Sequence, residues 1–148
     1  MNLLLDTNVI IDFLGRKEPY FDSAKRIIAA GYFGDATLWM SAGSAKDAFY
    51  VLSHYVEPTK VQQAILELLS EVAPVSLTAD DLARAARLEW TDYEDCLIAI
   101  SAEKAQARYI ITRDKTGFER SMVPTRTPDE WLAEMTAEGI TFDEISLD

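Results

Sequence analysis

The chain has 148 residues, of which 49% are hydrophobic, and this is the size of a single domain with one substantial core. Its one cysteine and one histidine exclude an intramolecular disulfide, a zinc site built on histidines and a histidine-dependent catalytic triad. Cys96 is expected to be a buried thiol, and His54 a surface or helix-end residue. Any catalysis would therefore depend on carboxylates.

The formal net charge of -11 is unevenly distributed along the chain. Residues 129–148 include seven acidic side chains and no Lys or Arg, so residues 1–128 carry a net charge of only -4. Phosphate binding normally uses basic surface, and a basic rim remains compatible with this distribution. We expect one domain over residues 1–148, with an acidic tail from about residue 138 that is either flexible or a partner-binding strand.

No apolar run approaches the roughly 20 residues that a membrane-spanning helix needs, and no secretory leader is recognisable. We therefore expect a cytoplasmic protein that does not contact a membrane.

The apolar run at residues 3–5, ending at Asp6, predicts a buried parallel strand. Apolar residues then recur at helical spacing from Val9 to Leu14. Periodicity, capping residues and helix breakers predict the remaining elements. These are helices at 21–32, 44–54, from Pro58, from Thr78 to about 88, from Asp92 to about 105 and from Thr127, with strands at 37–41, 72–77, 109–112 and 123–126.

The helical spacing also predicts that Tyr32, Tyr55 and Leu69 face the core. Trp39, Trp90 and Trp131 are expected to be packing aromatics, although an indole at the mouth of a pocket could stack on a base. Strands that alternate with helices imply right-handed crossovers and a mostly parallel sheet covered on both faces. The predicted fold class is a three-layer α/β/α fold, Rossmann-like in its general organisation.

Five aspartates are expected to converge at one edge of this sheet, because functional groups collect at the carboxyl ends of parallel strands. Asp6 ends the first strand, and Asp114 closely follows the strand at 109–112. Asp47, Asp92 and Asp95 lie in early turns of helices that leave the same edge. The candidate catalytic residues are Asp6, Asp47, Asp95 and Asp114.

Carboxylates packed this closely repel one another, and a hard divalent cation would relieve the repulsion. We expect Mg²⁺ or Mn²⁺, held by Asp6, Asp95 and Asp114 with Asp92 as a further candidate, to activate water for phosphodiester hydrolysis. The short polar residues Thr7, Asn8 and Thr112 would orient the carboxylates.

Several of these residues also have purely structural explanations. Asp92 could only cap its helix, and Asp47 could only favour the helix dipole. Four other aspartates are interpreted as solvated or capping acids: Asp12, Asp22, Asp80 and Asp81. Arg113 is the first candidate for a phosphate contact, and the further candidates for a basic rim are Lys46, Lys115 and Arg84 or Arg87.

These residues resemble the motifs of the PIN domain nucleases, which include VapC-like toxins of toxin–antitoxin pairs. LLLDTNVIIDFL resembles the first motif, with Asp6 and Asn8, and SAGSAKDAFYVL resembles the second, with Ser44 three residues before Asp47. DYEDCLIAISAEKAQARYIITRDKTGF resembles the third and fourth motifs, with Asp95 and Asp114, and VPTRTPDEWL resembles the closing strand and helix of one branch. The resemblance implies a Mg²⁺- or Mn²⁺-dependent endoribonuclease, often dimeric and often inhibited by an antitoxin. At the position of Asp47 the family more often has Glu, which has a longer side chain.

Two other interpretations remain open. A PIN-like fold without activity could serve as a binding module, which the acidic balance and the shorter Asp47 would favour. A haloacid-dehalogenase-like phosphatase would also have an acid after its first strand, but position 8 is Asn where that class has a second Asp. No G-x-G-x-x-G motif follows the first strand and no P-loop is present, which argues against a dinucleotide-binding domain or an NTPase.

Overall fold

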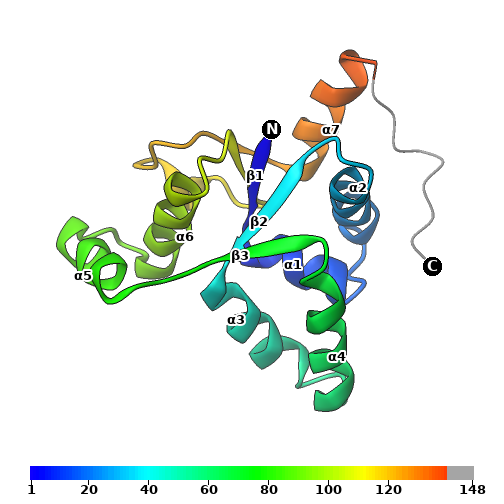
Figure 1. The fold of residues 1–148 in the computed structure, drawn as a ribbon, viewed down its shortest axis with the longest axis horizontal. Coiled ribbons are helices and arrows are strands. Elements are labelled where there is room, and N and C mark those ends of the chain that lie inside the picture. Colours follow the sequence, from blue (N-terminus) through cyan, green and yellow to red (C-terminus); the bar gives the residue numbers. More distant parts are fainter. Residues whose placement is uncertain (140–148) are drawn as a thin grey trace.

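Five parallel strands form the central layer of the structure, a computed structural model that describes residues 1–139 (Figure 1). The sheet order is β3-β2-β1-β4-β5. The strands are β1 (Asn2–Leu5), β2 (Thr37–Ser41), β3 (Val72–Val75), β4 (Tyr109–Ile111) and β5 (Thr125–Arg126). The predicted three-layer α/β/α fold with a parallel sheet is confirmed. The acidic tail predicted from about residue 138 lies almost entirely outside the described residues.

Helices cover both faces of this sheet. The elements are α1 (Thr7–Leu14), α2 (Phe21–Tyr32), α3 (Ala42–Leu52), α4 (Pro58–Leu68), α5 (Ala79–Leu88), α6 (Tyr93–Lys104), the 3₁₀ helix η1 (Thr116–Phe118) and α7 (Pro128–Ala137). Figure 1 shows α5 and α6 on one side of the sheet and α1, α2 and α7 on the other. Within residues 1–139, no helix is long and apolar enough to cross a bilayer.

Alternate residues of β1 point into two different cores, as the pleat of a strand requires. Leu3 and Leu5 pack in the larger core with α1, α2 and the fully buried Trp131 of α7. Leu4 packs in the second core against α6. Because both faces of β1 are covered, its three buried residues Leu3, Leu4 and Leu5 are apolar without alternation.

The topological switch point of the sheet lies at β1, which is paired with both β2 and β4. From β1 the chain moves outward through β2 to β3, and then crosses back to β4 on the other side of β1. The connections therefore diverge beyond the carboxyl ends of β1 and β4, and a crevice forms there.

Local sequence signals fix the ends of several helices. Thr78 and Thr127 form capping boxes with Asp81 and Glu130, as expected from the sequence. Asp92 caps α6 by accepting a hydrogen bond from the backbone N–H of Asp95. Cys96 is buried and His54 is exposed, in agreement with the sequence.

Three predictions of buried side chains are wrong. Tyr32 is 61% exposed, Tyr55 is 81% exposed and Leu69 is 39% exposed. Each lies at the last residue of a helix or beyond it, because α3 ends at Leu52 and α4 ends at Leu68. The predicted strands at 72–77 and 123–126 are also shorter, and α3 begins at Ala42 instead of Ser44.

Candidate active site

Asp6 lies where β1 ends and α1 begins, and it is 8% exposed. Its Oδ1 accepts a hydrogen bond of 2.7 Å from the backbone N–H of Thr7, so the carboxylate also caps α1. Its Oδ2 accepts a hydrogen bond of 2.8 Å from the hydroxyl of Thr112. Burial raises the pKa of Asp6, while these hydrogen bonds oppose the increase.

Thr112 connects the ends of the two central strands. Its hydroxyl donates to Asp6 and accepts from the side-chain amide of Asn8 at 3.2 Å and from the backbone N–H of Asp114 at 3.1 Å. Thr112 is fully buried, so this network has a fixed position. Asn8 and Thr112, which were predicted to orient carboxylates, therefore lie in contact with the Asp6 and Asp114 segments.

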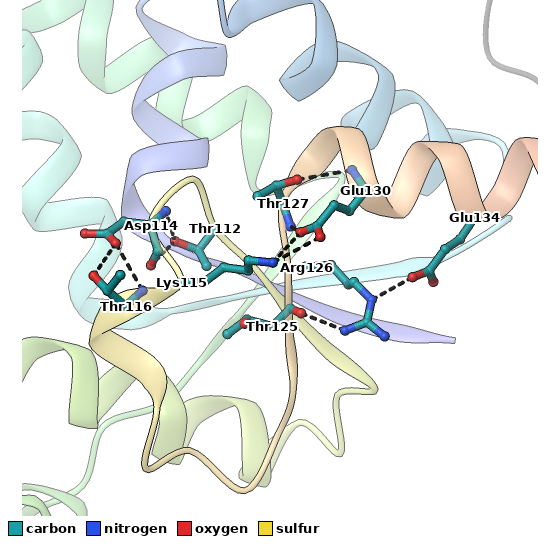
Figure 2. A network of polar contacts seen from close by, with 9 residues as sticks. All are labelled: Thr112, Asp114, Lys115, Thr116, Thr125, Arg126, Thr127, Glu130 and Glu134. Atoms are coloured by element: carbon teal, nitrogen blue, oxygen red, sulfur yellow. Dashed lines mark hydrogen bonds and ion pairs between the residues drawn. The ribbon is translucent and has the colours of Figure 1, made fainter.

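Asp114 is held by the first residue of η1. Its Oδ1 accepts hydrogen bonds from the backbone N–H of Thr116 at 3.1 Å and from the Thr116 hydroxyl at 2.6 Å (Figure 2). These contacts lower the pKa of Asp114. Because Asp114 is exposed and charged, its carboxylate faces the solvent side of the crevice.

Asp95 is the acid most affected by its neighbours. Its pKa is raised to about 6, first by burial and then by the charges of Asp92, Asp6, Asp114 and Glu94, in that order. The four aspartates Asp6, Asp92, Asp95 and Asp114, which we call the acid cluster, therefore lie within electrostatic reach of one another. Glu94, which also borders this site, was not predicted to belong to it, although it lies between Asp92 and Asp95 in the sequence.

Two cavities meet at Asp95. One, of about 370 Å³, is bordered by Asp92, Asp95, Asp114, Trp90 and Arg120 among others. The other, of about 310 Å³, is bordered by Asp6, Asn8, Ser44, Asp47, Glu94 and Asp95 among others. The structure thus places Asp47 at the cavity that Asp6 and Asp95 also border, whereas Asp92 borders the other cavity. The hydroxyls of Thr7 and Ser44 are 2.7 Å apart and join α1 to α3 beside Asp47.

Arg113 does not lie free beside the acid cluster. Its guanidinium donates to the carboxylate of Asp12 at 2.5 and 3.3 Å and lies 4.0 Å from the centroid of the Tyr20 ring. Asp12 is 1% exposed, so its interpretation as a solvated or capping acid is wrong. An unpaired carboxylate would be costly to bury at that position, and Arg113 compensates its charge.

The other predicted basic contacts lie elsewhere. Lys46 borders a cavity between α3 and α4, with Phe49 and Ile65, and neither cavity of the acid cluster. Lys115 donates to both oxygens of Glu130 at 2.9 and 3.0 Å (Figure 2). Arg84 pairs with Glu103, and Arg87 borders neither of the two cavities.

The acid cluster has the donor chemistry of a hard divalent cation site. Among residues 1–139, no group of three or more His, Cys, Asp or Glu side chains is arranged closely enough to enclose an ion. Mg²⁺, however, is commonly held by one or two carboxylates and keeps several waters. Burial and then the charges of neighbouring acids raise the pKa values of Asp6 and Asp95, and a bound cation would relieve that repulsion. The residues therefore fit a partly hydrated Mg²⁺ or Mn²⁺.

Comparisons with known proteins agree with this architecture. A family model described as PIN domain matches residues 2–116, which include every residue of the acid cluster. No curated protein sequence matches the chain.

Solved structures of similar fold include a VapBC2 complex from Rickettsia felis bound to a promoter DNA fragment, with 18% identity and a TM-score of 0.64, covering 86% of this chain and 98% of that one. They also include VapC20 of Mycobacterium tuberculosis, a sarcin–ricin loop cleaving toxin, with 14% identity and a TM-score of 0.66, covering 84% and 98%. FitAcB from Neisseria gonorrhoeae has 20% identity and a TM-score of 0.59, covering 85% and 97%. Because the family model covers most of the chain and the fold agrees, the protein belongs to the PIN domain family.

Proposed function

We propose that this protein is a Mg²⁺- or Mn²⁺-dependent endoribonuclease and the toxin of a toxin–antitoxin pair. The observation that carries the proposal is the meeting of Asp6, Asp95 and Asp114 from three separate elements at the switch point of a PIN domain. Acids that raise one another's pKa in a crevice are typical of a functional site. The similarity to VapC20, described as a sarcin–ricin loop cleaving toxin, favours RNA as the substrate.

Asp6, Asp95 and Asp114 would hold the metal, with Asp92 contributing directly or through water. When bound, the ion would lower the pKa of a coordinated water and neutralise charge on the scissile phosphate. The surrounding residues hold the carboxylates in position. Thr7 and Thr112 each donate a hydrogen bond to one oxygen of Asp6, and Thr116 donates to one oxygen of Asp114, so both carboxylates have a defined orientation.

Asp47 would act through a water molecule. It lies across the second cavity and is not among the charges that raise the pKa of Asp6 or Asp95. Its short side chain fits this indirect role. An Asp47→Glu variant should bind Mn²⁺ at least as tightly as the wild type, whereas Asp47→Asn should bind it more weakly.

The partner of the enzyme is proposed to be a basic antitoxin-like protein. A cavity of about 530 Å³ between α3 and α4 is bordered by the exposed side chains of Leu66 and Leu69 and by the partly buried side chains of Phe49 and Ile65. A net charge of -11 would attract a basic partner and speed its association. The similarity to the VapBC2 and FitAcB structures supports an antitoxin-like partner. A homodimer through the same surface is the alternative. Light scattering of the isolated chain would separate the two, because a dimer through α3 and α4 requires no second protein.

A PIN domain without activity, serving only as a binding module, is the second candidate. Two observations favour it. Within residues 1–139 the acids are not arranged to enclose an ion, and Asp47 stands where the family more often has Glu. A phosphatase of the haloacid-dehalogenase type is not supported, because Asn8 uses its side-chain amide to bind Thr112.

Cleavage of a panel of single-stranded and structured RNAs tests the proposal, with Mg²⁺, Mn²⁺ or EDTA present. Asp6→Asn should abolish metal-dependent cleavage and keep the fold, because Asn also caps helices well. Asp80→Asn is the matched control, since Asp80 borders neither cavity of the acid cluster. Absence of cleavage together with absence of calorimetric Mn²⁺ binding would contradict the nuclease and favour the binding module.

A further inference from the structure

The larger cavity beside the acid cluster is bordered by residues of two chemical kinds. Its lining includes the acids Asp92, Asp95 and Asp114, together with Trp90 and Arg120. The smaller cavity, which Asp95 also borders, has no Lys or Arg in its lining. Among the residues that the structure describes, Arg120 is therefore the one cation that borders either cavity.

Arg120 is a cation without a carboxylate partner among residues 1–139. Its guanidinium donates a long hydrogen bond of 3.4 Å to the backbone carbonyl of Glu89 and lies 5.8 Å from the centroid of the Trp90 ring. By contrast, the charges of Arg113 and Lys115 are compensated by Asp12 and Glu130. Of these three cations, Arg120 retains the charge needed for a phosphate.

The indole of Trp90 is held in place by the fold. Trp90 is half-buried and packs against both apolar clusters that involve α6. It follows Glu89, whose left-handed backbone (φ 52°, ψ 45°) ends α5, and it precedes Asp92 by only two residues. Because the ring is already ordered, contact with a base would cost little side-chain entropy.

We propose that Trp90 and Arg120 form a nucleotide subsite that holds one residue of single-stranded RNA beside the scissile phosphate. The base stacks on the indole, and a neighbouring phosphate contacts the guanidinium. This inference rests on the proposed nuclease function and names how that site selects its substrate. The cavity volume of about 370 Å³ lies within the range of small-ligand sites, which is roughly 300–1,000 Å³.

The chemistry of this subsite favours unpaired RNA of varied sequence. A base within a duplex is already stacked on its neighbours, whereas a single-stranded base has a free face for the indole. Every base has such a face, so stacking discriminates little between sequences. The acids and Glu119, which also borders the cavity, repel phosphate, and the charge of Arg120 partly offsets this repulsion.

The test measures binding of a fluorescently labelled single-stranded RNA to the Asp6→Asn protein by anisotropy, with Mg²⁺ present and at several salt concentrations. In this background, Trp90→Leu should weaken binding by about tenfold or more, as expected for a lost base stack. Trp90→Phe should keep most of the affinity. Neither substitution should change the dependence of affinity on salt, since neither alters a charge.

Arg120→Gln should weaken binding and also reduce the salt dependence, lowering the slope of log affinity against log salt by about 0.7 for one lost contact to a single strand. Arg87→Gln is the matched control, because it removes the same charge from α5 outside both cavities of the acid cluster. Tyr32→Leu is the matched control for loss of an exposed aromatic ring. Both controls should bind like the Asp6→Asn parent, and melting curves would verify that all variants fold.

The inference is overturned if Trp90→Leu binds RNA as tightly as its parent, or if Arg120→Gln and Arg87→Gln have the same salt dependence. Cleavage by the otherwise wild-type protein is measured separately on the same RNA. Cleavage with a KM that Trp90→Leu does not change would reject the subsite and keep the nuclease. Binding that depends on Trp90 without any cleavage would reject the nuclease and support the subsite.

Discussion

The carboxylate of Asp12 on α1 accepts two hydrogen bonds from the guanidinium of Arg113, the residue directly before Asp114. Asp12 is 1% exposed, whereas about a third of the Arg113 side chain is exposed to solvent. The pair joins α1 to the segment that follows β4, although the two residues are 101 positions apart. Arg113 is therefore a positioning residue for the Asp114 segment in addition to being a surface cation.

Removing either partner of this pair should have unequal effects on stability. Arg113→Ala leaves a buried carboxylate without compensation and should cost on the order of 3 kcal/mol of unfolding free energy. Asp12→Ala should cost less, on the order of 1 kcal/mol, because the exposed guanidinium can be solvated. Urea unfolding of both single variants and the double variant measures the difference. A double variant as unstable as the sum of the two single variants would show that the pair is not coupled.

The hydroxyl of Thr112 should be needed for metal affinity as well as for stability. Thr112→Val keeps the shape of the side chain but removes the donor to Asp6 and the acceptor for Asn8 and Asp114. We expect Mn²⁺ affinity to fall by about 10–100-fold, as is typical for groups that orient a metal ligand. Thr112→Ser keeps the hydroxyl and should retain most of the affinity. Equal Mn²⁺ binding by the Val and Ser variants in calorimetry would contradict this role.

Gly117 allows η1 to approach Asp95 closely. A β-carbon at this position would collide with the Asp95 carboxylate, so Gly117→Ala must displace either the carboxylate or η1. We expect cleavage to fall by about 100-fold while the fold persists, because small misplacements of a catalytic group cost this much. Gly139→Ala is a useful control. A β-carbon at position 139 would have no heavy atom within 4 Å among the described residues. Because the φ of Gly139 is positive, Gly139→Ala should lower stability without lowering activity.

Cleavage rates and melting temperatures of both glycine variants test this assignment. A Gly117→Ala enzyme with normal activity would show that Asp95 tolerates displacement and has no direct part in the reaction.

Neutralising Asp95 should stabilise the metal-free protein, and the gain should depend on pH. Asp95 has its pKa raised from about 3.8 to about 6 in the folded state, so folded protein binds more protons than unfolded protein between these values. The stability of the wild type should therefore fall as pH rises through this window and then remain level. Asp95→Asn should be more stable by about 1–2 kcal/mol at pH 7, which allows for solvent screening, and equally stable near pH 4.

Thermal unfolding with EDTA across pH 4–8 measures this difference. Addition of Mn²⁺ at pH 7 should stabilise the wild type and have little effect on Asp95→Asn, since only the folded site binds the ion. A stability gain that is the same at all pH values would indicate an effect other than the ionisation of Asp95.

Most of the fold follows from local features of the sequence. The helix at Phe21–Tyr32 agrees with its predicted bounds, and the capping signals at Thr78, Asp92 and Thr127 each mark the start of a helix. The sequence patterns gave the correct type for each α-helix and strand that they predicted, but they did not predict the 3₁₀ helix η1 (Thr116–Phe118). Apolar periodicity failed at Tyr32, Tyr55 and Leu69, because periodicity does not reveal where a helix ends or whether another element covers its last turn.

The sequence by itself determined the α/β alternation, the PIN domain motifs and the aspartates that belong to them, since these depend on residue type and spacing. The tertiary structure decided which charges compensate one another. Asp12 pairs with Arg113 and Lys115 with Glu130, while Arg120 borders the acid cluster without a carboxylate partner among residues 1–139. Such pairings depend on distances of a few ångströms between residues far apart in the chain, because the energy of a charge pair depends on separation and burial and not on sequence position.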